Sequence, residues 1–313
     1  MRLVFFGSPA FAVPSLAALL DAGHELTLVV SQPDRPAGRG RQLSPPPVAA
    51  FARAHGLPLW QTSRLRGAEV EARLRALHLD AMALAAFAAL VPANLLALTP
   101  AGILNVHPSL LPRWRGAAPI QAALLAGDAQ TGVSIMRLVE ALDAGPLLLQ
   151  QRLPIADADD YLTLEDRLAQ LGAEMLVTAL EQVAQGTAVL RSQDEALATY
   201  SQRIARDDAR IDWREPAEAI WRQVRAYRGW PQAFTTWQST SVKLLRTAPE
   251  AEPSGSAVPG TVLPGPLLRV ATGDGVLRVD ELVLAGRRPQ SGADFLRGYP
   301  RAVGTRFGAQ ESC

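Results

Sequence analysis

Short, almost wholly apolar runs alternate with amphipathic stretches along the first 190 residues. Strands that are buried on both faces of a sheet lose the apolar–polar alternation, so these runs predict buried strands. They lie at residues 3–6, 25–31, 81–86, 103–107 and 133–139. Apolar residues spaced three and four apart predict helices over residues 14–20, 48–55 and 165–183. This alternation indicates an α/β fold whose mostly parallel sheet is covered by helices on both faces.

The hydrophobic pattern changes after Gly186. Residues 191–205 show little periodicity and predict a linker, and residues 211–227 predict one more amphipathic helix. Short apolar runs separated by Pro, Gly and Ser turns follow at residues 233–237, 242–245, 260–263, 267–271 and 276–284. Runs of this kind are typical of a small β-barrel. We therefore expect a domain over residues 1–190, a linker over 191–205 and a β-barrel domain over 206–313.

Charge and cysteine content exclude several classes of protein. The 31 basic and 30 acidic side chains leave a net charge of +1, which excludes a polycation that coats nucleic acid by bulk charge. Residues 191–313 carry 17 basic and 14 acidic side chains, so the β-barrel is a plausible nucleic-acid surface, with ordinary surface charge as the alternative. The single cysteine, Cys313, excludes a disulfide scaffold and fits a reducing compartment. Pro92 interrupts the uncharged stretch 81–98, so we expect no membrane span and a cytoplasmic protein.

A polar pair at the end of a buried strand is the main candidate for chemistry. Side chains alternate across a strand, so Asn105 and His107 share one face at the carboxyl end of the strand 103–107. Asp143 follows the strand 133–139, and we expect its loop at the same edge of the sheet, where it would orient His107. The alternative is a polar pair that merely ends the strand.

The missing motifs restrict the chemistry further. The first strand is followed by Gly-Ser-Pro-Ala-Phe rather than by Gly-x-Gly-x-x-Gly, which argues against a dinucleotide cofactor. The chain has no Gly-Lys-Ser/Thr phosphate loop, and its four histidines are scattered, so we expect neither a nucleotide cofactor nor a metal. The chemistry would therefore rest on hydrogen bonds and proton transfer to a developing oxyanion, with a nucleophile supplied by a substrate.

The segments around this strand resemble the folate-dependent formyltransferases. Residues 105–120 read Asn-Val-His-Pro-Ser-Leu-Leu-Pro-Arg-Trp-Arg-Gly-Ala-Ala-Pro-Ile, and residues 142–145 read Leu-Asp-Ala-Gly. Within that family, three segments are similar to the methionyl-tRNA formyltransferases: Gln-Pro-Asp-Arg-Pro-Ala-Gly-Arg-Gly-Arg at 32–41, Ala-Arg-Ile-Asp-Trp at 209–213 and Ala-Asp-Phe-Leu-Arg-Gly at 293–298. The matches cover nearly the whole chain.

The resemblance implies a fold and a reaction. It implies a Rossmann-like catalytic domain, a C-terminal OB-like β-barrel that binds tRNA, and transfer of a formyl group from 10-formyltetrahydrofolate to the α-amino group of methionyl initiator tRNA in translation initiation. Asn105 and His107 would then hydrogen-bond the formyl oxygen as it becomes an oxyanion. Asp143 would hold His107 and help to take the proton of the attacking amine.

The resemblance also implies two binding segments. Folate would contact Ser109, Leu110, Leu111 and Pro112, and Phe87 would line its pocket, with a plain core role for Phe87 as the alternative. The acceptor end of the tRNA would contact the glycine-rich loop, where Asp34 opposes three arginines; these are Arg35, Arg39 and Arg41. The alternative for this loop is a solvated turn. We expect a monomer, because no seam for a dimer is evident.

Three departures from the family pattern leave the catalytic residues complete. Pro108 stands where this family usually has glycine, and Ala144-Gly145-Pro146 replaces Thr-Gly-Asp beside Asp143. Ala86-Phe87-Ala88 replaces Ala-Tyr-Gly, which removes a hydroxyl from the expected folate pocket.

Two other functions are considered as alternatives. The first is the same formyl transfer to a small amine, such as an amino sugar or a purine precursor. The arginine loop and the basic second domain argue against it, since a small substrate needs neither. The second is a tRNA-binding protein whose catalytic half has decayed, and the intact Asn105, His107 and Asp143 argue against that.

Overall fold

The chain forms two compact units, each described here by itself. The computed structural model describes residues 1–37, 42–252 and 255–309. The first unit comprises residues 1–119, 130–155 and 165–201, and the second comprises 120–129, 156–164 and 202–313. Residues 191–201 of the expected linker therefore pack with the first unit.

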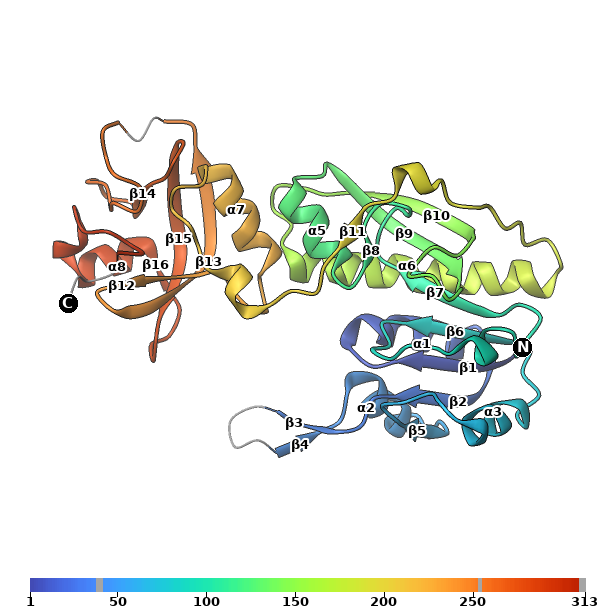
Figure 1. Cartoon of the computed structure of the whole chain (residues 1–313). Coiled ribbons are helices and arrows are strands. Elements are labelled where there is room, and N and C mark those ends of the chain that lie inside the picture. The colour runs from blue at the N-terminus through green and yellow to red at the C-terminus, as the bar shows by residue number, and fades with distance from the viewer. Residues whose placement is uncertain (38–41, 253–254, 310–313) are drawn as a thin grey trace. The chain divides into compact units, whose positions relative to one another are not determined.

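A seven-stranded sheet forms the centre of the first unit (Figure 1), in the order β10-β9-β7-β6-β1-β2-β5. Its strands are β1 (Arg2–Gly7), β2 (Glu25–Ser31), β5 (Leu59–Gln61), β6 (Ala81–Ala85), β7 (Ile103–His107), β9 (Gln130–Arg137) and β10 (Leu147–Pro154). The five strands from β5 to β7 are parallel, and β9 and β10 run antiparallel to their neighbours. The predicted Rossmann-like sheet is confirmed.

Helices cover both faces of this sheet. On one face, the glycine at position 172 of α6 (Tyr161–Ala184) lies against β7, where an added Cβ would come within 2.5 Å of a Val106 methyl group. On the opposite face, Val4, Met82 and Ile103 form one apolar cluster with α3 (Ala68–Arg75) and α4 (Ala93–Leu96). The first unit also contains α1 (Val13–Asp21) and α2 (Pro47–Ala54), which contact each other and β2.

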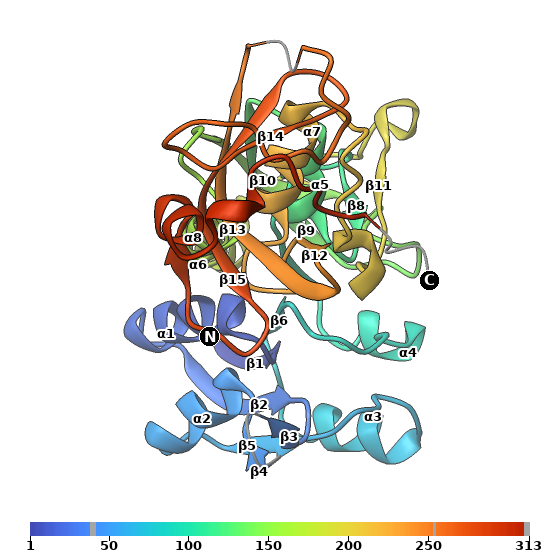
Figure 2. The same ribbon diagram turned by 90° about the vertical axis from the view of Figure 1, so that its left-hand side faces the viewer.

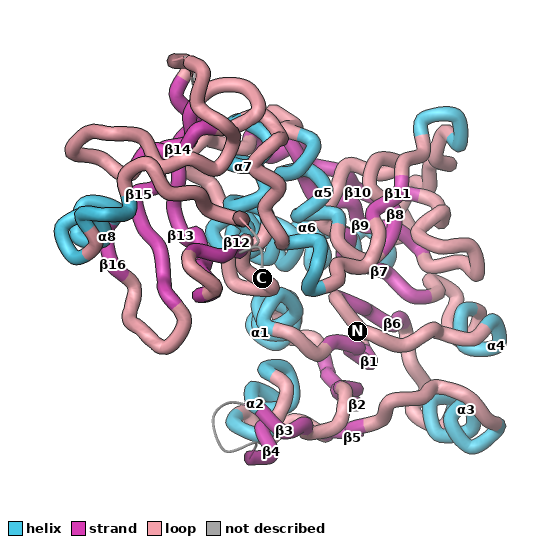
Figure 3. Tube along the Cα trace, turned by 60° about the vertical axis from the view of Figure 1, so that its left-hand side comes forward, coloured by secondary structure: helices cyan, strands magenta, loops and turns pink. Residues whose placement is uncertain are grey.

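The second unit is built on an antiparallel sheet, as expected for the small β domain (Figures 2 and 3). Its elements are α7 (Ala217–Ala226), β12 (Phe234–Trp237), β13 (Thr240–Glu250), β14 (Arg269–Ala271), β15 (Val276–Leu284), β16 (Gln290–Ser291) and α8 (Gly292–Gly298). Its core contains the two indoles of Trp213 and Trp237. Each buried indole N–H donates to a threonine hydroxyl, on Thr235 at 3.0 Å and on Thr305 at 2.9 Å, so neither polar atom is left unsatisfied.

The apolar pattern misses several edge elements. The expected strand at 260–263 makes only single bridges, from Thr261 to Arg306 and from Val262 to Val270. Conversely, β10 was not predicted, because it lies at the edge of the sheet and exposes Gln151 and Arg152. The short elements not predicted are β3 (Arg35–Ala37), β4 (Gln42–Ser44), β5, α3, β8 (Arg115–Gly116), α5 (Pro119–Ala126), β11 (Tyr200–Ser201), β16 and α8. Within the described ranges, no helix combines the length and the apolar character needed to cross a membrane.

Candidate functional site

Asn105 and His107 lie side by side on β7, on the sheet face that α3 and α4 cover. The strand neighbours of Asn105 are apolar, since it is paired with Leu84 on β6 and with Met136 on β9, whereas His107 is paired with Ser134 on β9. The two side-chain positions are only 6% and 4% exposed. Among the described residues, none makes a hydrogen bond with the Asn105 amide. A nearly buried amide with free donors in apolar surroundings is suited to binding a substrate oxygen.

The His107 ring is held between two acceptors. Nε2 lies 3.0 Å from the main-chain oxygen of Trp114, and because a carbonyl oxygen only accepts, Nε2 is the donor. Nδ1 faces the carboxylate of Asp143, with 3.8 Å between Nδ1 and Oδ2. A proton that reaches Nδ1 would therefore lie beside a negative charge. The structure thus brings together the three side chains expected to carry the chemistry.

Asp143 and Trp114 both have left-handed backbone conformations, with φ of 48° and 61°. Such conformations are uncommon for residues other than glycine, and strained residues tend to cluster at functional sites. The Asp143 carboxylate is fixed by the amide of Gly116, which donates to Oδ2 at 2.8 Å. Gly145 allows the loop to lie close to β9, because a Cβ there would lie 1.8 Å from the main-chain oxygen of Arg137.

The path of the Asp143 loop differs from the expected one. We expected this loop at the edge of the sheet where β7 ends, as it would be if the strand before it continued to that edge. Instead β9 is antiparallel to β7, and Arg137 pairs with Leu104 near the start of that strand. The loop then folds back along β7 to reach His107. The sequence did not predict this direction, because a buried apolar strand has the same pattern in either orientation.

Two side chains of the expected folate segment, those of Ser109 and Leu111, are buried within the protein. The Ser109 hydroxyl is buried and donates to the main-chain oxygen of Arg113 at 2.6 Å, and Leu111 packs against Met136. Leu110 and Pro112 are half-buried. Side-chain contacts from this segment to folate would therefore come from Leu110 and Pro112.

Phe87 lies mainly in the core. Its ring meets the ring of Phe6 edge-on at 5.7 Å, and only 9% of the residue is exposed. Its folate role, like that of the segment above, stays a prediction.

The expected tRNA loop starts from a small hairpin. β3 pairs with β4 in antiparallel register, and Arg35 at its base is exposed and donates to the Gln32 side chain at 3.3 Å. Arg39 and Arg41 lie outside the described residues. Their roles stay predictions.

The described partners of Asp34 lie outside this loop. Gln61 donates to its carboxylate at 2.6 Å, and Arg53 lies 3.4 Å away. The hydrogen bond from Gln61 and the charge of Arg53 hold the pKa of Asp34 below its ordinary value. Asp34 therefore belongs to the base of the hairpin.

The sequence pattern did not identify Arg115, a buried arginine beside the site. Arg115 is 1% exposed, and its guanidinium donates to both carboxylate oxygens of Glu195, at 2.8 and 2.7 Å, and to the side-chain oxygen of Gln193. The hydrogen bonds with Glu195 raise the pKa of Arg115 and lower that of Glu195. No local pattern reveals partners so far apart in sequence. We call residues 191–201 the strap, because Thr199 and Ser201 also hydrogen-bond to the segment that follows Pro112.

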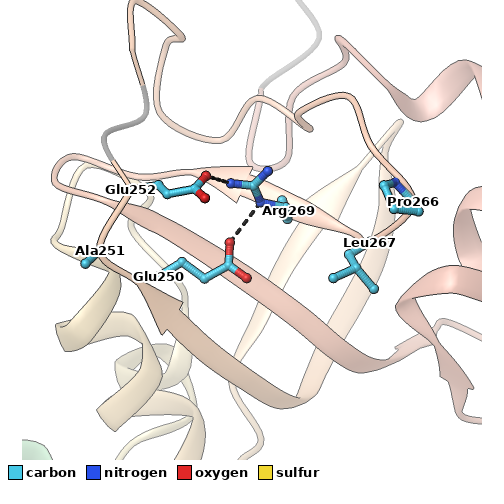
Figure 4. A pocket seen from close by; sticks show the side chains of 6 residues that line it. All are labelled: Glu250, Ala251, Glu252, Pro266, Leu267 and Arg269. Atoms are coloured by element: carbon cyan, nitrogen blue, oxygen red, sulfur yellow. Dashed lines mark hydrogen bonds and ion pairs between the residues drawn. The ribbon is translucent and has the colours of Figure 1, made fainter.

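An open hollow in the second unit contains none of the expected site residues. It is lined by Glu250, Ala251, Glu252, Pro266, Leu267 and Arg269 (Figure 4). Arg269 pairs with Glu250 at 2.8 Å and also with Glu252, so two carboxylates face one guanidinium. This surface is unsuited to phosphate. Over the described ranges, no cluster of three His, Cys, Asp or Glu side chains is placed to hold a metal.

Known proteins resemble the chain along its whole length. The Formyl transferase family matches residues 1–180, and the Formyl transferase C-terminal domain matches residues 203–300. A methionyl-tRNA formyltransferase of Methylobacillus flagellatus is 44% identical over 99% of the chain and 100% of its own length. The enzyme of the same name from Thiobacillus denitrificans is 46% identical over the same shares.

Solved structures share the fold at low sequence identity. An N-formyltransferase of Helicobacter canadensis, in complex with folinic acid and dTDP-3-aminofucose, is 17% identical over 89% of the chain and 98% of its own, with a TM-score of 0.68. HypX of Aquifex aeolicus, in complex with tetrahydrofolic acid, is 16% identical over 99% of the chain and 51% of its own, with a TM-score of 0.64.

Proposed function

The chain belongs to the methionyl-tRNA formyltransferases of the formyl transferase family, and we propose that the site formed by Asn105, His107 and Asp143 carries out its reaction. The enzyme transfers a formyl group from a folate donor to methionyl-tRNA. In our proposal the donor is 10-formyltetrahydrofolate, the acceptor is the α-amino group of methionyl initiator tRNA, and the protein works in the cytoplasm as a monomer.

The free amide of Asn105 is the observation that carries the proposal. When the amine attacks the formyl carbon, the carbonyl oxygen gains negative charge. Donors that are already in place stabilise this charge most strongly in the tetrahedral transition state, and nearly buried surroundings strengthen the effect. Asn105 supplies such donors, and His107 lies two residues further along the same face of the strand.

Asp143 is the group that transfers the proton from the attacking amine to the leaving nitrogen. The attacking amine must lose a proton once its nitrogen is bonded to the formyl carbon, and N10 of the folate must gain one as it leaves. The carboxylate of Asp143, with His107 Nδ1 at 3.8 Å, takes the first proton and returns one to the leaving nitrogen. The two steps together leave the protein unchanged and convert the donor to tetrahydrofolate.

The two substrates bind through different segments. Folate binds at the segment formed by Ser109, Leu110, Leu111 and Pro112, and at Phe87. The acceptor end of the tRNA binds the hairpin loop through Arg35, Arg39 and Arg41. The C-terminal domain binds the tRNA electrostatically, without reading its sequence. Salt would therefore weaken the binding of tRNA more than that of folate.

A substrate comparison tests the proposal. Purified protein and 10-formyltetrahydrofolate are incubated with methionyl initiator tRNA, with methionyl elongator tRNA or with a nucleotide-linked amino sugar, and the formylated product is quantified. We expect formyl-methionyl initiator tRNA as the main product. A preference for the amino sugar would refute the proposed acceptor, and a lack of product from all three would refute the catalytic role of the site.

A further inference from the structure

The place of the Asp143 carboxylate depends on a loop that has no regular structure of its own. Asp143 lies between β9 and β10 in a left-handed conformation, with φ of 48°. The antiparallel course of β9 brings this loop back along β7 from Arg137 to His107. A strained residue in an irregular loop keeps its place only when neighbouring groups hold it there.

Gln193 of the strap holds the main chain of this loop. Its Nε2 donates to the main-chain oxygen of Asp143 at 2.8 Å and to that of Gly145 at 2.7 Å. Its side-chain oxygen accepts from Nε and Nη2 of Arg115, at 3.1 and 2.9 Å. Carbonyl oxygens only accept and a guanidinium only donates, so the orientation of this amide is determined by its partners, and both of its hydrogens are used.

The same arrangement reaches the carboxylate from the other side. Arg115 is followed by Gly116, whose amide donates to Oδ2 of Asp143 at 2.8 Å. The hydrogen bonds therefore close a ring that runs from the Asp143 main chain through Gln193 and Arg115 to Gly116 and back to the Asp143 side chain. The far side of the guanidinium is fixed by both carboxylate oxygens of Glu195.

We propose that Gln193 is a positioning residue for formyl transfer: it acts through Asp143, by holding that carboxylate beside His107. The inference rests on the proposed role of Asp143 and adds Gln193 of the strap to the residues on which the reaction depends. The contribution of Gln193 is to keep the carboxylate of Asp143 where the amine releases its proton. Small displacements of a catalytic group weaken catalysis strongly, whereas substrate affinity depends on other contacts.

Two substitutions separate positioning from packing. Gln193→Glu keeps the size of the side chain and an acceptor for Arg115, but it removes both donors and directs a charge at two carbonyl oxygens. Gln193→Ala removes the side chain altogether, and because Gln193 is half-buried, it opens no cavity in the core. We expect kcat to fall by about 10- to 100-fold in both variants, with KM for tRNA and for folate unchanged.

Gln223 provides a matched control. Its Nε2 also donates to two main-chain oxygens, those of Asp208 at 2.9 Å and Arg210 at 3.2 Å, and it is half-buried as well. Gln223→Ala therefore removes two hydrogen bonds from a side-chain amide to main-chain oxygens, as Gln193→Ala does, but in the second unit. We expect it to retain the wild-type kcat.

A double substitution gives the decisive readout. If Gln193 acts through Asp143, then Gln193→Glu combined with Asp143→Asn has the same kcat as Asp143→Asn alone. An equal proportional loss in both backgrounds would show that Gln193 supports the fold in general and would overturn the proposal. So would a wild-type kcat in Gln193→Glu while Asp143→Asn is impaired, which would leave the role of Asp143 intact. A wild-type kcat in Asp143→Asn would instead refute the proposed function of the site itself.

Discussion

Asp143→Asn removes one negative charge with little change of shape. The asparagine oxygen can still accept from the amide of Gly116, which lies 2.8 Å from Oδ2 in the wild type. The new amide donors face Nδ1 of His107, where the carboxylate lay at 3.8 Å. The change therefore keeps the loop in place while it removes the group that takes the proton.

The expected loss can be worked out from the role of the carboxylate. A positioned general base contributes about 10²- to 10⁴-fold to a rate, which corresponds to about 3 to 5 kcal/mol in the barrier. The fold loses only the charge assistance of one hydrogen bond, worth about 1 kcal/mol of unfolding free energy. We therefore expect a large fall in kcat with KM for both substrates unchanged, because the lost interaction acts in the transition state.

Single-turnover formylation of methionyl-tRNA at saturating folate donor measures this effect. Glu140→Gln is the matched control, since it makes the same chemical change at an exposed position of the same loop. We expect Glu140→Gln to react at the wild-type rate. If Asp143→Asn reacts as fast as Glu140→Gln, the assignment of the base is wrong.

Three further outcomes are expected. Arg39→Leu should weaken tRNA binding by about 1 to 3 kcal/mol in a filter-binding titration, whereas Arg66→Leu, at an exposed position outside the hairpin, should not; equal effects would contradict the tRNA role of the loop. Gly172→Ala should lower the free energy of unfolding by about 1 to 3 kcal/mol, because its methyl group would overlap the valine of β7 that α6 covers; unchanged denaturation in urea would contradict this packing. Hydrogen bonds from Arg214 lower the pKa of Asp212 from 3.8 to about 2, so this pair stabilises the protein above pH 3.8, and the stabilisation is lost as the pH falls to about 2. Because the pair is exposed, Asp212→Asn should cost less than about 1 kcal/mol of unfolding free energy near pH 5 and nothing near pH 2, as urea titrations at both pH values would show.

The central strands were predictable from sequence because burial on both faces leaves a continuous apolar run. The structure places β2 at Glu25–Ser31, β7 at Ile103–His107 and β15 at Val276–Leu284, the ranges that the pattern predicts. Edge elements were harder to predict. β10 mixes buried leucines with the exposed Gln151 and Arg152, so its pattern does not stand out from that of a loop.

The candidate site was only partly predictable, for a different reason. Asn105 and His107 follow from side-chain alternation within one strand, which is a local property. The direction of β9 depends on which strand it pairs with, and the partners of Arg115 lie about 80 residues further along the chain. Residues 191–205 show little periodicity because their strap part is held by hydrogen bonds rather than by an apolar face.

The strap determines where this protein can be cut. A fragment that ends at residue 190 keeps Asn105, His107 and Asp143, yet it lacks Gln193 and Glu195. The guanidinium of Arg115 would then lose the acceptors that it bonds in the whole chain. A catalytic fragment prepared for isolated study should therefore extend at least through Ser201.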